Sequence, residues 1–310
     1  MRAITQRSIG GPSVLESVEI ERPVPTVTEV LVRVHATSVN PVDAYVRAGA
    51  FPLLGEPPFV LGWDVSGVVE EVVPGVTDLR VGDEVYGMPL FPRQAGTYAE
   101  YVAAPSRQFA RKPKGLSHAE AAALPLAGLT AWQALVDGAK LQAGQRVLIH
   151  AAGGGVGHLA VQIAKALGAE VYATASAEKH DFLRELGADH LIDHRTADFT
   201  DGLTGLDVVL DGIGGDVAER SLGVLRDGGA LVTLVRSSDR EFAERTAAAG
   251  RRFVPFTAEP DRVGLAALTD LVETGRLRPH VEHRLPLADA AKAHELIATG
   301  RTKGKIVLIP

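Results

Sequence analysis

The first third of the chain carries hydrophobic residues at alternate positions. The pattern is clearest in EVLVRVHATSV at 29–39, and shorter runs of the same kind follow at 66–73, 82–88 and 97–104. A period of two predicts half-buried β-strands. Glycine, proline and aspartate separate these runs, as in PGVTDLRVGD, and mark turns. Short strands at close spacing predict an antiparallel barrel or sandwich.

The pattern becomes helical near Ser117, in SHAEAAALPLAGLTAWQALVDGAKL. Ser117 and Glu120 have the spacing of a capping box, in which each side chain accepts from the other residue's N–H at the start of a helix. Pro125 lies inside this segment and should interrupt or kink it, because proline cannot supply a helical N–H.

From Gln145 onward, predicted strands and helices alternate. The strands are RVLIHA, EVYATA, HLIDH, DVVLDG, GALVTLV and RRFVPF, and the helices GHLAVQIAKALG and AEKHDFLRELG each end in glycine. This alternation predicts a parallel sheet covered by helices, and six strands fit a doubly wound nucleotide-binding domain. A strand, a helix and a final strand follow, which we expect to return to the first domain.

A glycine-rich turn joins the first of these strands to its helix. Its register is Ala152-x-Gly154-x-x-Gly157, with Gly155 and Val156 inside it, so alanine replaces the first glycine of the dinucleotide-binding fingerprint. Gly154 would let a pyrophosphate approach the backbone and Gly157 would let helix and strand pack closely. The helix N-terminus offers free N–H groups and a positive dipole end to phosphates. The alternative is a structural turn without a ligand.

The end of the second strand indicates which dinucleotide is bound. NAD-binding domains carry an acidic residue there for the ribose 2′-hydroxyl, whereas EVYATA ends before Ser176, with Glu178 and Lys179 close behind. A hydroxyl and an ammonium group suit a 2′-phosphate better, so NADPH is the favoured cofactor. Alternatively, Ser176 only caps a helix and Lys179 is a solvated cation.

Composition and charge narrow the function classes. The 310 residues are 46% hydrophobic and 23% charged, which suits a globular protein of two domains. A formal net charge of -6 disfavours nucleic acid as a partner. The absence of cysteine excludes disulfides, thiolate zinc sites and cysteine nucleophiles. The first residues lack a signal-peptide core and no run is apolar enough to span a membrane, so a cytoplasmic protein is expected.

The order of the motifs points to a known family. They include VNPVDAYVRAG at 39–49, LGWDVSGVVEEVVPGV at 61–76, AAALPLAGLTAWQAL at 121–135, HAAGGGVGHLAVQIAKALGA at 150–169 and TKGKIVLIP at 302–310. The chain resembles the zeta-crystallin-like quinone oxidoreductases, a zinc-free branch of the medium-chain dehydrogenase/reductase superfamily.

The resemblance implies an α/β protein of two domains. Residues 1–120 and 262–310 would form a GroES-like β-barrel catalytic domain around a doubly wound Rossmann domain at 121–261, which binds NADPH. It further implies a cleft for cofactor and substrate between them, and a homodimer that pairs through an edge of the nucleotide-binding sheet.

The sequence disfavours a zinc site. The zinc-dependent relatives have Gly-His-Glu where this chain has Gly62-Trp63-Asp64, and they use cysteine ligands. The ten histidines are spread along the chain, and a catalytic zinc requires three protein ligands. We therefore expect a metal-free site.

The resemblance places the chemistry in the segment at 40–45. Asn40 would lie beside the nicotinamide and Tyr45 would face the substrate, both as hydrogen-bond donors. Asp43 is a weaker catalytic candidate, better suited to a structural acceptor than to a general base. Trp63 would stack on a flat acceptor. Alternatively, Asn40 only builds a turn before proline, and Tyr45 and Trp63 are packed aromatic residues.

Further cofactor contacts rest on the family pattern alone. Thr130 would meet the nicotinamide, and Ile213 would lie against the adenosine side. Leu234 and Val235 would hold the carboxamide through their backbone, and Lys305 would reach the cofactor from the barrel. In the alternative interpretation Thr130 bonds its own helix backbone, the aliphatic residues are core, and Lys305 is solvated.

Three functions remain open at this point. The leading hypothesis is an NADPH-dependent reductase of quinones or related conjugated carbonyls, since hydride transfer to an electron-poor acceptor needs less help than the alcohol chemistry of a zinc enzyme. The second is a reductase of enoyl or 2-alkenal C=C bonds, including a step in polyketide biosynthesis. The third is a non-enzymatic, NADPH-gated binding protein.

Overall fold

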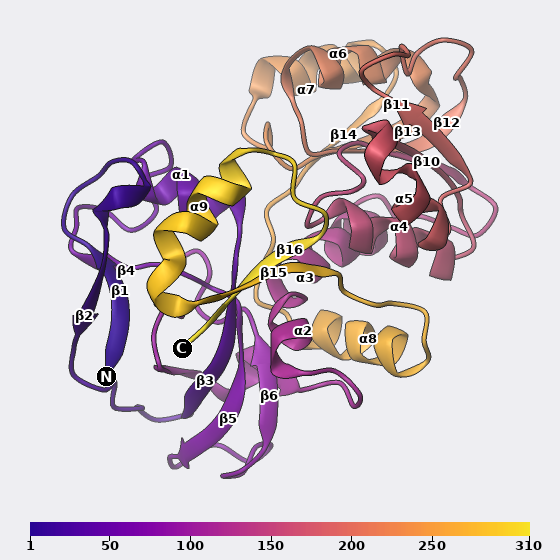
Figure 1. Ribbon diagram of the computed structural model, residues 1–310. Coiled ribbons are helices and arrows are strands. Elements are labelled where there is room, and N and C mark those ends of the chain that lie inside the picture. Colours follow the sequence, from indigo (N-terminus) through magenta and orange to yellow (C-terminus); the bar gives the residue numbers. More distant parts are fainter. The chain divides into compact units, whose positions relative to one another are not determined.

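A computed structural model describes all residues from Met1 to Pro310. The chain packs into two compact units (Figure 1). The first unit comprises 1–129, 259–273 and 279–310, and the second comprises 130–258 and 274–278. The first boundary lies later than the predicted 120/121 and the second lies earlier than the predicted 261/262. That residues 1–120 and 262–310 form a catalytic domain and 121–261 an NADPH-binding domain remains a prediction.

The first unit is mainly antiparallel β-structure. Its strands are β1 (Arg2–Gln6), β2 (Leu15–Glu19), β3 (Glu29–Val39), β4 (Phe59–Val60), β5 (Val65–Val72), β6 (Glu84–Gly87), β7 (Tyr101–Pro105), β8 (Phe109–Arg111), β15 (Val281–Pro286) and β16 (Lys305–Ile309). The larger sheet has the order β15-β16-β3-β5-β6-β8, with β7 also on β3, and the smaller has the order β2-β1-β4. The alternating run at 29–39 is therefore β3, as predicted, and its buried valines form the core with those of β5 and β6.

Short helices join or cover these strands. They are α1 (Pro41–Arg47), α2 (His118–Ala122), α8 (Arg262–Glu273) and α9 (Ala290–Ala298), with 3₁₀ turns η1 (Pro12–Val14), η2 (Ser106–Gln108) and η5 (Leu287–Asp289). The capping box at Ser117 and Glu120 is confirmed. Pro125 ends the continuity of the helical segment, because α3 (Pro125–Trp132) begins there as a separate helix. The π-helix η3 (Gln133–Gly138) continues α3.

The end of the chain returns to the first unit, as predicted. The strand β16 pairs antiparallel with β3, with Ile306 opposite Val39. This register brings residue 305 next to residue 40, although the two are far apart in sequence. A hydrogen-bonded strand thus positions one residue of the site described below.

The second unit is one parallel sheet with helices on both faces. Its strands are β9 (Arg146–Ile149), β10 (Glu170–Ala175), β11 (His190–Asp193), β12 (Leu206–Asp211), β13 (Leu225–Thr233) and β14 (Arg252–Pro255). Its helices are α4 (Gly157–Ala166), α5 (His180–Glu185), α6 (Gly215–Val224) and α7 (Arg240–Ala248), with η4 (Ala177–Lys179). Figure 1 shows α6 and α7 on one face of the sheet and α4 and α5 on the other.

The strand order locates the expected ligand site of this unit. The order β11-β10-β9-β12-β13-β14, with every pair parallel, is that of a doubly wound dinucleotide-binding sheet. The direction of winding reverses between β9 and β12, and ligands of such sheets bind at the carboxyl ends of the strands at that point. The glycine-rich turn follows β9 there, so the predicted fold class is confirmed.

Candidate active site

Asn40 lies where β3 gives way to α1. It is the N-cap residue of α1 and Pro41 is the first helical residue, where its missing N–H leaves no bond unmade. The Asn-Pro pair therefore starts a helix rather than only a turn, a helix that the sequence analysis did not predict. Asn40 is buried, and its backbone N–H donates to the carboxylate of Asp43 at 2.7 Å.

The carboxamide of Asn40 is fixed by two charged groups. Its Nδ2 donates to Asp64 Oδ2 at 2.8 Å, and its Oδ1 accepts from the ammonium group of Lys305. The positions of the amide oxygen and nitrogen are thereby determined. One Nδ2 hydrogen remains for another acceptor, since the amide carries two.

Asp64 is the centre of this cluster and is fully buried. Its Oδ2 also accepts from the hydroxyl of Ser38, and its Oδ1 accepts from the backbone N–H of Leu126 at 2.7 Å. Both carboxylate oxygens are therefore satisfied, as a buried charge requires. The cluster unites β3, the segment before β5, α3 and β16.

Lys305 is neither solvated nor directed outward. Only 3% of it is exposed, and its Nζ lies 3.1 Å from the carbonyl oxygen of Val39 and 3.4 Å from Asp64 Oδ2. Burial lowers the pKa of the Lys305 ammonium group, while Asp64 and Asp43 raise it. Contact with the cofactor through Lys305 remains a prediction, but the structure assigns its ammonium group to Asn40 and Asp64.

The other candidates around Asn40 differ sharply in exposure. Tyr45 on α1 is 53% exposed, so its phenol is available to a ligand. Trp63 is completely buried, packs edge-on against Phe91 and donates from its indole to the carbonyl oxygen of Arg93 at 2.7 Å. The structure thus supports the core interpretation of Trp63 over stacking on a substrate.

Asp43 is a structural acceptor in this site. It is fully buried, and it accepts from the Asn40 N–H and from the hydroxyl of Tyr98. Burial raises its pKa to about 7; Asp64 adds to the increase, and the backbone hydrogen bond from Asn40 opposes it. Since Asp43 has no solvent exposure, this environment favours the structural acceptor over the general base.

The glycine-rich turn has the properties of an anion site. The N–H groups of Gly155 and Val156 donate no hydrogen bond within the chain, and α4 begins at Gly157. A Cβ atom at Gly157 would lie 2.5 Å from the carbonyl oxygen of Ala151, so only glycine fits. Unpaired N–H groups at the N-terminus of a ten-residue helix suit a pyrophosphate.

The backbone of this turn departs from the expected pattern at one residue. Alanine at 152 is buried and has ordinary geometry, but the preceding Ala151 has a φ of 50°. A left-handed conformation is unfavourable for a residue with a Cβ, and such strain collects at ligand sites. The chain therefore turns one residue earlier than the fingerprint register implies.

The two candidate 2′-phosphate residues lie beside this turn. The side chain of Lys179 runs across Gly153, where a Cβ would meet its Cδ at 2.5 Å. Ser176 is buried and caps η4 through its backbone, without a side-chain capping bond. Glu178, which lies between these two residues in the sequence, forms an ion pair with Arg195 at 3.1 Å.

The loop after β12 is organised by Asp211. This fully buried carboxylate accepts from the N–H groups of Ile213 at 2.9 Å and Gly214 at 3.0 Å, and from the Thr233 hydroxyl at 3.2 Å. Ile213 is held at the surface with 53% exposure, so it is not a core residue. Its contact with a cofactor remains a prediction.

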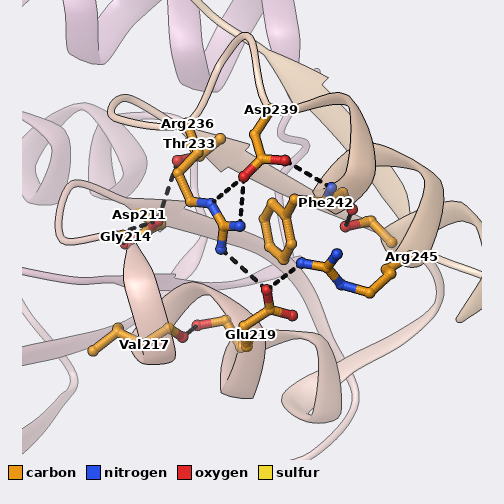
Figure 2. A network of polar contacts seen from close by, with 11 residues as sticks. Asp211, Gly214, Val217, Glu219, Thr233, Arg236, Asp239, Phe242 and Arg245 are labelled. Atoms are coloured by element: carbon orange, nitrogen blue, oxygen red, sulfur yellow. Dashed lines mark hydrogen bonds and ion pairs between the residues drawn. The ribbon is translucent and has the colours of Figure 1, made fainter.

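The segment after β13 is held by a network of ions, shown in Figure 2. The Arg236 guanidinium bonds to Asp239 and, at 3.2 Å, to Glu219 on α6, and it lies 3.9 Å from the Phe242 ring centroid. Arg245 on α7 also bonds to Glu219, at 2.6 Å. These bonds tie the chain just beyond Leu234 and Val235 to both helices.

Existing hydrogen bonds limit how the N–H groups of Leu234 and Val235 can bind a carboxamide. The N–H of Leu234 already donates to the Asp211 carbonyl oxygen at 2.8 Å. The N–H of Val235 has only a long bond to the Thr233 hydroxyl, at 3.4 Å. Val235 is the better placed donor of the two. Thr130 is buried in α3, and its role stays a prediction.

Several site residues were missed because no local pattern marks them. They are Arg47, Asp64, Tyr98, Arg195, Asp211, Arg236 and His294. Asp211 followed by glycine resembles an Asx turn and is the one that sequence could have revealed. No group of three His, Asp or Glu side chains is arranged to hold a metal ion. No helix has the length and apolarity needed to cross a membrane.

Comparisons with known proteins agree with this architecture. The model of the alcohol dehydrogenase GroES-like domain matches residues 26–114, and that of the zinc-binding dehydrogenase family matches 186–308. The human quinone oxidoreductase is 32% identical over 327 aligned positions, which cover 100% of this chain and 98% of that protein. The chain belongs to the quinone oxidoreductase family.

This family forms a zinc-free branch of the medium-chain dehydrogenases and reductases, and solved members share the fold. The quinone oxidoreductase of Coxiella burnetii has a TM-score of 0.95 at 38% identity and covers 100% of this chain and 99% of its own. That of Escherichia coli, solved as a complex with NADPH, has a TM-score of 0.90 at 30% identity, with 100% of both chains covered.

Two further relatives are named as an oxidoreductase of alkenals and alkenones and as a polyketide synthase protein. An NADPH-dependent alkenal/one oxidoreductase from chloroplasts of Arabidopsis thaliana is 37% identical over 100% of this chain and 80% of its own. The spectinabilin polyketide synthase system protein of Streptomyces orinoci is 42% identical over 80% of this chain. The chain spans only 12% of that protein, and only 5% of a polyketide synthase from Streptomyces halstedii.

Proposed function

We propose that the chain is an NADPH-dependent oxidoreductase that reduces quinones or related conjugated carbonyl compounds without a metal. The glycine-rich turn carries this proposal. Its unpaired N–H groups at Gly155 and Val156 and the closely packed Gly157 fit a pyrophosphate. The NADPH complex of the similar Escherichia coli enzyme supports the same cofactor.

The surroundings of the turn favour NADPH over NADH. Lys179 crosses the turn at Gly153, and Ser176 ends the second strand of the sheet, so a cation and a hydroxyl would bind the 2′-phosphate. The carboxylate of Glu178, which would repel that phosphate, forms an exposed ion pair with Arg195 at 3.1 Å, and this pair weakens the repulsion. No acidic residue ends that strand, where NAD-specific domains carry one for the ribose hydroxyl.

The residues of the first unit would stabilise the product as it forms. When bound, NADPH supplies the hydride. The acceptor oxygen gains negative charge in such a reduction, and positioned donors stabilise that charge. Asn40 offers its remaining amide hydrogen in a fixed orientation, and the exposed phenol of Tyr45 is a second donor. Asp64 and Lys305 hold the Asn40 amide in that orientation.

A second candidate function is the reduction of an enoyl or 2-alkenal C=C bond. It is favoured by the similarity to the Arabidopsis thaliana alkenal/one oxidoreductase and to segments of polyketide synthases. The same donors would stabilise the enolate that forms when hydride adds to such a bond. Only the shape of the substrate site separates the two activities.

We also propose a cytoplasmic homodimer that pairs through an edge of the parallel sheet. The two edge strands of this sheet are β11 and β14, and an unpaired strand edge is suited to pairing with a second copy. Light scattering after size exclusion would measure the mass, and a monomer at micromolar concentration would contradict the dimer.

The deciding experiment follows the absorbance of reduced nicotinamide. NADPH and NADH are each tested with 1,4-benzoquinone and with a 2-alkenal. Oxidation of NADPH but not NADH with the quinone supports the proposed function. Turnover of the alkenal alone selects the second candidate. NADPH binding without turnover of any acceptor overturns both in favour of a non-enzymatic binding protein.

A further inference from the structure

A row of buried polar groups joined by hydrogen bonds leads away from Asn40 within the first unit. Asp43 accepts from the Asn40 N–H at 2.7 Å and from the Tyr98 hydroxyl at 3.3 Å. The same hydroxyl lies 3.2 Å from Nε2 of His294, and Nδ1 of His294 lies 3.0 Å from the Arg47 guanidinium. All five residues are buried, so water does not compete for these bonds.

The donor and acceptor chemistry of these groups gives the row of hydrogen bonds a single direction. A guanidinium only donates, so Nδ1 of His294 must accept from Arg47. Burial, and next Arg47, lower the pKa of His294 to about 3, so the ring is neutral and carries its proton on Nε2. Nε2 then donates to Tyr98, whose one hydroxyl hydrogen goes to Asp43. Each group donates to the next, from Arg47 to Asp43.

The segment around Tyr98 is built to hold that ring. Gly62 has a φ of 95°, and a Cβ atom there would lie 2.4 Å from the Tyr98 ring. Tyr98 and His294 meet edge to face, with ring centroids 5.9 Å apart. The segment between β6 and β7, helix α9 and helix α1 therefore meet at the Tyr98 hydroxyl group.

We propose that Tyr98 and His294 are positioning residues for Asn40, acting through the carboxylate of Asp43. The inference rests on the proposed function, in which Asn40 donates to the acceptor. Lys305 and Asp64 orient the Asn40 side chain. The row of hydrogen bonds that ends at Asp43 holds the Asn40 backbone at the start of α1. Asn40 is thereby fixed at both its amide group and its main chain.

The proposal predicts a particular pH dependence. Ionised Asp43 is the stronger acceptor, so it holds Asn40 best. Burial raises the pKa of Asp43 to about 7; Asp64 adds to this, while the Asn40 N–H, Lys305 and Tyr98 oppose it. Turnover should therefore rise as the pH increases through about 7. One Asp43 oxygen, Oδ1, has no partner and can take up the proton below that pH.

The first test replaces Tyr98 with phenylalanine. Removing its hydrogen bond raises the pKa of Asp43, so the inflection of kcat should move up by about one pH unit, the effect of one bond to a charged group. Y86F is the matched control, because Tyr86 is equally buried and donates to the Leu265 carbonyl oxygen at 2.6 Å. An equal loss at every pH in Y98F would contradict the proposal.

The second test uses two variants of His294. A glutamine can accept from Arg47 and donate to Tyr98, whereas a leucine can do neither. H294Q should keep the wild-type inflection and most of kcat, and H294L should behave like Y98F. The same loss in both variants would mean that only the volume of the ring matters, and would overturn the proposal.

A third measurement does not depend on activity. Hydrogen exchange of residues 38–48 should be faster in Y98F and H294L than in Y86F, because the start of α1 loses its anchor. If the wild type turns over no acceptor but this exchange difference appears, the proposed function fails and the anchoring of Asn40 stands. If the wild type is active and exchange in Y98F equals that in Y86F, the anchoring fails alone.

Discussion

The glycine-rich turn and the Asn40 cluster are built in opposite ways. The turn is a continuous stretch between β9 and α4, and its proposed function depends on backbone groups and on residues without side chains. The cluster joins side chains from Ser38, Asp64 and Lys305, which only the folded barrel brings together. A site made of backbone groups can be predicted from a short stretch of sequence, whereas a site made of side chains from distant segments is seen only in the folded structure.

The largest expected effect comes from breaking the buried pair of Lys305 and Asp64. K305M leaves the Asp64 carboxylate buried without its cation and should lower the free energy of unfolding by about 3–5 kcal/mol. It should also lower kcat, because the Asn40 amide loses its orienting donor. Denaturant unfolding and steady-state kinetics measure the two effects.

The control for this variant is K165M, which breaks the more exposed pair of Lys165 and Asp189. Such surface pairs contribute about 0–1 kcal/mol. The double variant D64N/K305M should recover part of the lost stability, since it removes the unpaired charge. Equal destabilisation by K305M and K165M would show that the buried pair is not a distinct element.

The next effect concerns the charge on Asp43. Its pKa is raised from 3.8 to about 7. A carboxyl group with a raised pKa stabilises the fold fully below its unfolded pKa, and this contribution is lost as the pH rises through the folded value. A change of this size corresponds to roughly 4 kcal/mol. D43N should therefore gain stability relative to wild type between pH values of about 4 and 7.

Thermal unfolding of both proteins across this range measures the difference. D227N is a suitable control, because Asp227 is almost fully exposed. A difference between wild type and D43N that stays constant with pH would contradict the raised pKa. Charged Asp43 thus costs stability while it holds Asn40, a trade typical of functional sites.

The third prediction breaks the local site. G157A forces a Cβ against the backbone of Ala151 and Ala152, and overpacking of this kind costs about 1–3 kcal/mol. NADPH affinity should fall in the same variant, as measured by nicotinamide fluorescence. The control is G223A within α6, where a Cβ meets nothing within 4 Å. Unchanged affinity in G157A would remove the turn from the cofactor site.

The smallest effect sharpens the choice of cofactor. K179A should raise the KM for NADPH about tenfold, the effect of one charge-assisted bond to a phosphate, and leave the KM for NADH unchanged. Lys292, an exposed residue of α9, provides the control K292A. An equal rise for both nucleotides would assign Lys179 to the pyrophosphate or to the fold instead of the 2′-phosphate.

Local patterns predicted most of the fold. The alternation at 29–39, the capping box at Ser117 and the six strands with their helices all have causes within a few residues of chain. The helix after Asn40 was missed because Asn-Pro also begins turns. Trp63 was ambiguous, because sequence does not show whether an aromatic ring faces solvent or core.

The candidate site was less predictable for the same physical reason. Lys305 and Asn40 were proposed from the family pattern, but their bond to each other follows from the register of β16 on β3. Tyr98 and His294 lie far apart in the chain, and neither stands in a recognisable motif. Their roles depend on hydrogen bonds across the barrel, which no spacing rule encodes.

The pairing of β16 with β3 has a consequence during synthesis. A ribosome has released most of the barrel and the whole parallel sheet before residue 305 emerges, and domains generally begin to fold in that order. Until then the carboxylate of Asp64 has no cation, and β3 has an open edge on which β16 will pair. The nascent protein therefore completes its parallel sheet first and the cluster around Asn40 last, so an unfinished chain lacks the bond from Lys305 that orients the Asn40 amide.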